Sequence, residues 1–431
     1  SKEQILQSPF AKADYTNIDL PPNIFPARQN SFGYDLGNLA HIEELKQGLA
    51  EQRFTKLEQK TPLENMVTEA QRGFEELGNF NLQERAAIIE KAANLLEQKR
   101  FEVINAVMVE GKKTIADAIN ELREAVDMCR YYAQQAKQIM QPKKMASITG
   151  EENIYSLHGR GVFVCISPWN FPLAIFMGQV VATLVTGNSV IAKPAEQTPT
   201  IAKIAIDILH EAGVPKAAAQ LAYASGTDVG KIILTNPQIN GVCFTGGTDT
   251  AKRIQSIIQN NPAIIPFIAE TGGQNCMIVD STALPEQAVD DIITSAFGSA
   301  GQRCSALRVL YVQADIADKL IELIKGATQL LDFGNGFEAD VQDIIDEPAK
   351  QKLLAHATKF GQNSLPAIIE IDSINQLTEE VFGPVLHIIK FDDLNKVVQE
   401  INSTGYGLTF GIHTRIMKRA EMLAHKIKAG N

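Results

Sequence analysis

The chain has 431 residues, about two to three times the usual size of one folding unit, so its length predicts at least two packed domains. A composition of 45% hydrophobic and 21% charged residues is typical of globular proteins and excludes a fibrous or disordered chain. The net charge of −10, with both signs interspersed, gives no reason to expect nucleic acid as a partner. No run approaches the roughly 20 apolar residues of a membrane span and no secretory signal opens the sequence, so a cytoplasmic location is expected.

The first third of the chain predicts an arm followed by helices. Residues 1–37 are rich in Pro and Asn and show no period, so they are expected to form an extended arm or linker. Apolar residues recur at helical spacing from Leu82 to about Met140. Residues 38–142 are therefore expected to form a helical block that packs on the next domain, and residues 143–158 a connecting or oligomerisation segment.

After His158 the pattern changes to short apolar runs that alternate with helices. Such strands are typical of a parallel sheet covered on both faces. A first series occupies residues 159–276 and a second occupies residues 277–431, since one open sheet seldom holds so many strands. The predicted fold class is α/β, with two parallel-sheet domains and an N-terminal helical block.

The cysteines form an odd set with no CxxC pair, which predicts neither a disulfide framework nor a zinc site, and no metal site is expected. They are Cys129, Cys165, Cys243, Cys276 and Cys304. Cys304 lies in a connection between a helical run and a strand-like run, where a thiol can face a cleft. Arg303 beside it favours the thiolate, the form that attacks a carbonyl carbon. The alternative is a buried loop cysteine that only packs.

Two further residues fit attack of a thiol on a carbonyl group. Glu270 follows an apolar run and precedes two glycines, which suits a general base for the water that hydrolyses a thioester, although it also fits a helix cap. Asn170 lies in a turn held by Pro168 and Pro172, where its amide N–H can stabilise a developing oxyanion. A plain turn is the alternative for Asn170.

A third group of residues suits a nucleotide. Lys193 and Glu196 follow a predicted strand and can hold ribose hydroxyls, and Gly246 and Gly247 open the next helix with N–H groups free for a pyrophosphate. A GxGxxG fingerprint is absent, so the glycine spacing alone indicates an anion site and nothing more specific. Glu196 near a ribose would repel a 2′-phosphate, which favours NAD over NADP.

Six segments in this order resemble the aldehyde dehydrogenase superfamily, from about Asn81 to the end: PWNFP, KPAE, FTGGT, ETGGQN, GQRC and EEVFGPV. The resemblance implies an aldehyde-dehydrogenase-like fold with an NAD-binding and a catalytic domain. It implies Cys304 as nucleophile, Glu270 as base, and Asn170 with the Cys304 N–H as the oxyanion hole. It also implies NAD as cofactor, held by Ser167, Trp169, Lys193, Glu196, Gly246, Gly247, Glu380 and Phe382.

A narrower resemblance rests on residues 121–127, 130–133, 269–281 and 304–308. These segments are similar to the L-glutamate γ-semialdehyde (1-pyrroline-5-carboxylate) dehydrogenase half of bifunctional proline utilization A proteins, and residues 30–36 are similar to their linker. This implies oxidation of the semialdehyde to L-glutamate through a cysteine thiohemiacetal and a thioester. It also implies a proline dehydrogenase domain on the same full-length chain and a homo-oligomer. The implied aldehyde pocket consists of Glu124, Phe171 and Ser305.

The sequence departs from the family at several points. Gly247 stands where the family usually has Ser, and Ala251 where it often has Gly. The family continues beyond Asn431 with a strand, a loop that grips the substrate carboxylate and an oligomerisation strand, so the end of the catalytic domain is expected to be missing. Two alternatives remain: a CoA-acylating semialdehyde dehydrogenase, against which Glu270 argues, and a catalytically silent scaffold with this fold.

Overall fold

The computed structural model describes residues 21–334 and 336–431. Most of the predicted N-terminal arm, residues 1–20, therefore lies outside the described residues. Its remainder begins with a 3₁₀ turn at Pro21–Asn23 and continues to residue 37 without helix or strand. Ser31 fixes this stretch to the helical block, since its backbone N–H and its hydroxyl donate to the Asp127 carboxylate at 2.6 and 2.9 Å.

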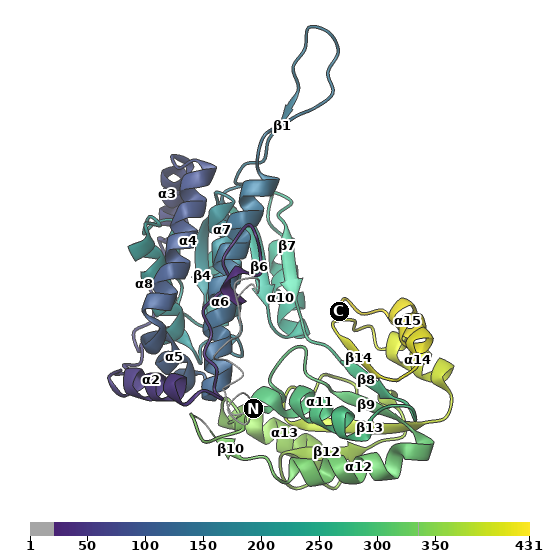
Figure 1. The fold of residues 1–431 in the computed structure, drawn as a ribbon. Coiled ribbons are helices and arrows are strands. Elements are labelled where there is room, and N and C mark those ends of the chain that lie inside the picture. The colour runs from purple at the N-terminus through teal and green to yellow at the C-terminus, as the bar shows by residue number, and fades with distance from the viewer. Residues whose placement is uncertain (1–20, 335) are drawn as a thin grey trace, which may run out of the picture.

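Five helices form the block that the apolar period predicted. Their bounds are α2 Leu39–Ala50, α3 Met66–Gly78, α4 Leu82–Gln98, α5 Arg100–Glu110 and α6 Ile115–Ile139. Helix α4 begins with a reciprocal capping box between Asn81 and Glu84, which satisfies two N–H groups at the helix start. The apolar faces of α4, α5 and α6 share one core with the first sheet, so the block and that sheet pack as one lobe (Figure 1).

A two-stranded antiparallel hairpin leaves this lobe and projects away from it, as Figure 1 shows. Its strands are β1 Lys143–Lys144 and β2 Ile154–Tyr155. The large apolar side chains along this segment are exposed: Met145, Ile148, Ile154, Tyr155 and Leu157. The hairpin occupies the predicted connecting segment.

The first sheet is parallel, in the order β5-β4-β3-β6-β7. Its strands are β3 Val162–Ile166, β4 Ser189–Lys193, β5 Ala219–Leu221, β6 Ile239–Thr245 and β7 Phe267–Glu270. Separate cores lie on its two faces, which explains why the strands are apolar throughout. The helices along this part of the chain are α7 Ala174–Val185, α8 Pro199–Ala212, α9 Gly226–Asp228, the π-helical turn Val229–Ile233 and α10 Thr248–Ile258.

The second sheet is also parallel, in the order β12-β13-β9-β8-β14, and it forms the other lobe in Figure 1. Its strands are β8 Cys276–Val279, β9 Val309–Gln313, β12 Ala367–Glu370, β13 Val385–Phe391 and β14 Phe410–His413. The accompanying helices are α11 Pro285–Phe297, α12 Ala314–Thr328, α13 Glu347–Lys359, α14 Leu394–Ser403 and α15 Met417–Lys426, with short 3₁₀ turns at Gly298–Gly301 and Ile374–Gln376. A small parallel pair, β10 Phe333–Gly334 and β11 Val341–Gln342, lies apart from this sheet.

The predicted α/β fold with two parallel sheets and a helical block is confirmed. Cys276, which the expected ranges placed with the first unit, opens β8 of the second sheet. Within residues 21–334 and 336–431 no helix is both long and apolar enough to cross a membrane.

Candidate active site

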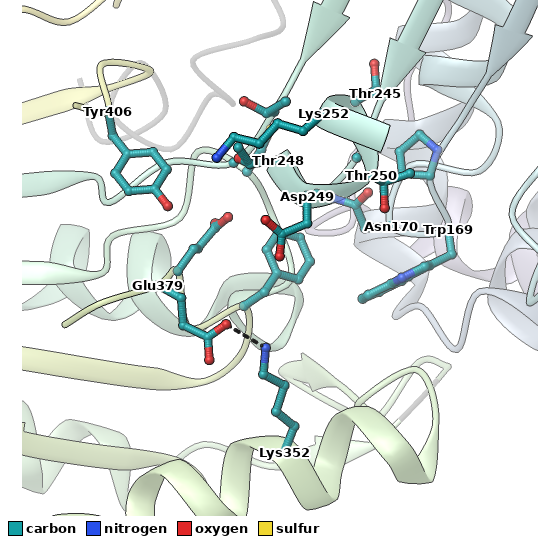
Figure 2. A pocket seen from close by; sticks show the side chains of 18 of the residues that line it. Trp169, Asn170, Thr245, Thr248, Asp249, Thr250, Lys252, Lys352, Glu379 and Tyr406 are labelled. Atoms are coloured by element: carbon teal, nitrogen blue, oxygen red, sulfur yellow. Dashed lines mark hydrogen bonds and ion pairs between the residues drawn. The ribbon is translucent and has the colours of Figure 1, made fainter. Parts of the chain in front are cut away.

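The carboxyl ends of the first sheet carry most of the predicted site residues. The turn with Asn170 follows β3, Lys193 ends β4, Gly246 follows β6, and Glu270 ends β7. Parallel strands end at one edge of a sheet, so these residues gather there. A cavity of about 520 Å³ lies between this edge and the second lobe (Figure 2).

The cavity joins residues that are far apart in the sequence. Seven of the predicted residues line it: Trp169, Asn170, Gly246, Gly247, Cys304, Glu380 and Phe382. The other seven are not among the described residues that line it: Ser167, Lys193, Glu196 and Glu270 on the first sheet, and Glu124, Phe171 and Ser305 in the expected aldehyde pocket. Trp169 and Phe382, one from each lobe, meet edge to face with ring centroids 5.7 Å apart.

The loop before Cys304 has an unusual backbone. Ser299, Ala300 and Gly301 all lie in the left-handed region, with φ of 53°, 54° and 62°. A Cβ at Gly301 would lie 2.3 Å from the carbonyl oxygen of Gly383, so only glycine fits there. Left-handed Ser and Ala cost free energy and persist only where the surroundings hold them, which is typical of functional sites.

Asp117, in the first turn of α6, holds this loop. Its carboxylate accepts from Arg303 Nη2 at 2.6 Å and from the Ser299 hydroxyl at 2.8 Å, and Arg303 Nε donates to the same hydroxyl at 2.7 Å. The structure therefore gives no support to the expectation that Arg303 favours the Cys304 thiolate. Its guanidinium is paired with Asp117, and the cation that lowers the pKa of the thiol is Arg308.

Two amide side chains fix the peptides around Cys304. Asn170 Nδ2 donates to the carbonyl oxygen of Gln302 at 3.0 Å, which orients the amide while its second N–H is left for another acceptor. Asn275 Nδ2 donates to the carbonyl oxygens of Cys304 and Ala306 at 2.6 and 2.9 Å. The sequence analysis gave Asn275 no role, although it closes the ETGGQN segment. The cysteine is thus held from both lobes.

Cys304 differs from the other four cysteines because it alone lines the cavity. Burial raises the pKa of its thiol, and the nearby Glu380 carboxylate raises it further, while the backbone N–H groups of Ser305 and Cys304 and the charge of Arg308 lower it. Burial raises the pKa of Cys129 to about 12, as expected for a packing thiol.

Glu270 lies at the rim of the cavity. Its carbonyl oxygen accepts the Gly246 N–H at 3.1 Å, and its side chain is exposed. The next two residues, Thr271 and Gly272, do line the cavity. The structure therefore places the predicted base beside Cys304's cavity, with its carboxylate toward solvent.

The expected aldehyde-pocket residues gather around a buried ion pair that the sequence analysis missed. Lys113 Nζ lies 3.3 Å from Glu121 Oε1, with both side chains almost fully buried, and 4.8 Å from the centroid of the Phe171 ring. Burial, with the charge of Glu121, raises the pKa of Glu124, and Lys113 lowers it. Ser305, by contrast, is exposed. The structure thus brings Phe171 and Glu124 to one charged centre.

The opposite end of the cavity suits a phosphate group. Gly247 is the N-cap of α10, and a Cβ built on it meets no atom within 4 Å. The first turn of α10, with Thr248, Asp249 and Thr250, lines the cavity, and the N–H groups and dipole of a helix N-terminus favour an anion. Lys193 is buried with its Nζ 2.9 Å from the Pro194 carbonyl oxygen, and burial lowers its pKa. Exposed Glu196 accepts the Gly226 N–H at 3.1 Å. These residues fit a dinucleotide.

The family model of the aldehyde dehydrogenase family matches residues 52–364 and 366–431. This chain belongs to the aldehyde dehydrogenase family. It is 39% identical to the bifunctional protein PutA of Rhizobium meliloti, over 100% of this chain and 39% of that protein. It is 31% identical to 1-pyrroline-5-carboxylate dehydrogenase 1 of Halalkalibacterium halodurans, over 85% of this chain and 76% of that protein.

Among solved structures, a mutant of Bradyrhizobium japonicum proline utilization A superposes with a TM-score of 0.92 at 43% identity. The alignment covers 97% of this chain and 45% of that chain. The chain therefore spans less than half the length of the bifunctional relatives that it matches.

Some residues that line the cavity had no sequence signal. They are Asp249, Lys252, Lys352 and Tyr406, all of which are labelled in Figure 2. Lys352 Nζ on α13 lies 3.0 Å from Glu379 Oε2, although 27 residues separate them. Only Glu379 was signalled, by its place in EEVFGPV.

Among the residues that the structure describes, no group of three or more His, Cys, Asp or Glu could hold a metal ion.

Replacing Gly247 by serine is expected to strengthen dinucleotide binding by about two- to tenfold, since a hydroxyl at the N-cap adds one hydrogen-bond donor for a phosphate oxygen. The substitution fits because φ is −69° and an added Cβ meets no atom within 4 Å. Trp169 is the only tryptophan and lines the cavity, so its fluorescence reports titration with NAD. Gly247→Ala is the matched control, and equal affinities for both variants would refute the role of the hydroxyl.

Proposed function

We propose that this chain is an NAD-dependent aldehyde dehydrogenase that oxidises L-glutamate γ-semialdehyde to L-glutamate. The observation that supports the reaction type is the lining of the cavity, which includes Cys304, Asn170 and the first turn of α10. A nucleophile, an oxyanion donor and an anion site in one cleft are what thiol-mediated aldehyde oxidation requires.

The chemistry then follows from the residues present. The Cys304 thiolate attacks the aldehyde carbon, and the oxygen of the resulting thiohemiacetal anion accepts hydrogen bonds from the Asn170 amide and the Cys304 backbone N–H. Bound NAD would supply the acceptor for the hydride that leaves this carbon. Water then attacks the thioester while Glu270 takes its proton, which releases the acid and the thiol. This last role requires the Glu270 carboxylate to turn from solvent toward Cys304.

The cofactor would lie along the carboxyl edge of the first sheet. The residues at the N-terminus of α10, with Gly246 and Gly247, would hold the pyrophosphate, and Glu380 the nicotinamide ribose. Lys193 and Glu196 would hold the other ribose, where the Glu196 carboxylate disfavours the 2′-phosphate of NADP. Ser167, Trp169 and Phe382 would complete the nicotinamide end.

The substrate assignment rests on the relatives and on the pocket charges. Relatives that share this fold are named 1-pyrroline-5-carboxylate dehydrogenases. The semialdehyde carries an ammonium group, which the Glu124 carboxylate suits, and an aliphatic chain that can pack on Phe171 and Ser305. A proline dehydrogenase domain on the full-length chain would supply the substrate. The exposed apolar hairpin suits assembly into a homo-oligomer.

A CoA-acylating dehydrogenase is the second candidate, because Glu270 does not line the cavity and such an enzyme needs no base to activate water. One assay separates the two. NADH formation is measured with L-glutamate γ-semialdehyde and with a panel of simple aliphatic aldehydes, with and without CoA. We expect the semialdehyde to give the highest kcat/KM, with glutamate as product and no dependence on CoA. An acyl-CoA product would overturn the proposal, and equal rates across the panel would overturn the substrate assignment.

A further inference from the structure

We propose that Arg308 is a positioning residue that couples the cofactor side of the cleft to the nucleophile: its guanidinium joins the loop carrying Cys304 to the loop carrying Glu380 and Phe382. The inference rests on the proposed function for the roles of those residues. Arg308 lies just before β9, and its side chain is 1% exposed. It is among the largest fully buried side chains of the described residues.

The guanidinium contacts both loops at once. On the Cys304 loop, Nη1 donates to the Gly301 carbonyl oxygen at 2.5 Å and Nη2 donates to the Arg303 carbonyl oxygen at 2.8 Å. On the other loop, the same Nη2 lies 3.1 Å from Glu380 Oε1, and the guanidinium carbon lies 5.0 Å from the centroid of the Phe382 ring. A planar fork serves these acceptors together, whereas a lysine ammonium is a single point charge.

The base of the side chain is itself fixed in the second sheet. The Arg308 N–H donates to the Asn275 carbonyl oxygen at 3.0 Å, and the Arg308 carbonyl oxygen accepts the His387 N–H at 3.0 Å. The guanidinium therefore stands on a rigid support between β8 and β13. A displacement of Glu380 is transmitted to the Cys304 loop through one side chain rather than through a flexible chain of contacts.

The ion pair also acts on the thiol electrostatically. The Glu380 carboxylate raises the pKa of Cys304 and the Arg308 charge lowers it, so the two partners act in opposite directions. Arg303 is paired with Asp117. The other charged side chains that line the cavity are Asp249, Lys252, Lys352 and Glu379. A ligand hydroxyl that binds the Glu380 carboxylate would therefore change the pKa of the Cys304 thiol, which Glu380 raises and Arg308 lowers.

The test is the pH dependence of Cys304 alkylation by iodoacetamide, followed by peptide mass spectrometry without cofactor or aldehyde. Glu380→Gln removes the opposing carboxylate, so the midpoint of the profile should fall. A fall of one unit gives about tenfold more thiolate below the midpoint, and the weaker nucleophilicity of a more acidic thiol reduces the gain to about threefold in rate near pH 7. Glu379→Gln, which removes a carboxylate of the same cavity that is paired with Lys352, should leave the midpoint unchanged.

Arg308→Met provides the opposite shift. When Arg308→Met is added to the Glu380→Gln variant, the thiol loses the positive charge of Arg308. The midpoint of the alkylation profile should then rise. Arg308→Lys keeps the charge and loses the fork, so the midpoint should stay near that of the unaltered chain while kcat for NADH formation falls. An unchanged midpoint in Glu380→Gln, or no rise on adding Arg308→Met, would overturn the proposal. If Arg308→Met shows no cooperative melting, the Glu380→Gln profile decides alone. Alkylation needs no aldehyde, so failure of the dehydrogenase assay leaves this test intact.

Discussion

Steady-state NADH formation should fall by at least about 10⁴-fold when Cys304 is replaced by alanine, because the covalent step then has no nucleophile. The structure gives no substitute thiol. Cys129, Cys165 and Cys276 are buried in the cores, and Cys243, the other partly exposed cysteine, does not line the cavity. The measurement is the initial rate at saturating NAD and semialdehyde, with NAD binding followed by Trp169 fluorescence to show that the cleft is intact.

Cys243→Ala is the matched control, since it removes a partly exposed thiol on β6 that lies outside the cavity. It should retain the rate of the unaltered chain. Steady turnover by Cys304→Ala at more than a few per cent of that rate would refute the nucleophile assignment. Loss of NAD binding together with activity would point instead to a collapsed loop.

Glu270→Gln should separate the two halves of the reaction. The thiol can still attack and the hydride can still leave, so a burst of about one NADH per active site is expected. The later steady rate should fall by about 10²–10⁴-fold, because hydrolysis of the thioester loses its base. Rapid-mixing absorbance measures both phases, and intact-mass spectrometry should detect the accumulated acyl group on Cys304.

The control for this variant is Glu286→Gln, an exposed carboxylate in the first turn of α11. It should show neither a burst nor a change in steady rate. An unchanged steady rate in Glu270→Gln would show that another group activates water. A lost burst would place Glu270 before the thioester, for example in activating the thiol.

The positions of the strands and their ends could be predicted because they follow from local pattern. Apolar runs form β3, β4 and β6, and Ser167, Lys193 and Gly246 lie at or just after the ends of these strands. Because the strands are parallel, the three residues lie at one edge of the sheet. The resemblance supplied the pairing of Cys304 with Glu380 across the cleft, which neither spacing nor composition contains. The roles of the motif residues were therefore assigned from the six motifs taken together and in order, and not from any single residue.

The side-chain directions could not be predicted. Arg303 is adjacent to Cys304 in sequence, yet its guanidinium is paired with Asp117 on α6, and a cation that lowers the pKa of the thiol is Arg308. Lys113 and Glu121 gave no signal because a buried ion pair looks like two ordinary helix-surface charges in a sequence. The left-handed backbone of Ser299 could not be predicted either, since contacts with residues distant in the sequence impose such a conformation.

The clamp between Asp117 and Arg303 also bears on how the molecule can open. It is one of several links between the lobes: Ile115 N–H donates to the Gly336 carbonyl oxygen at 3.0 Å, and Lys112 Nζ donates to that of Ile344 at 3.2 Å. These three links lie around the start of α6, beside the loop that carries Cys304. Separation there would break the contacts that hold the nucleophile loop. A dinucleotide that leaves the cavity without breaking these links should therefore leave the Cys304 loop in place.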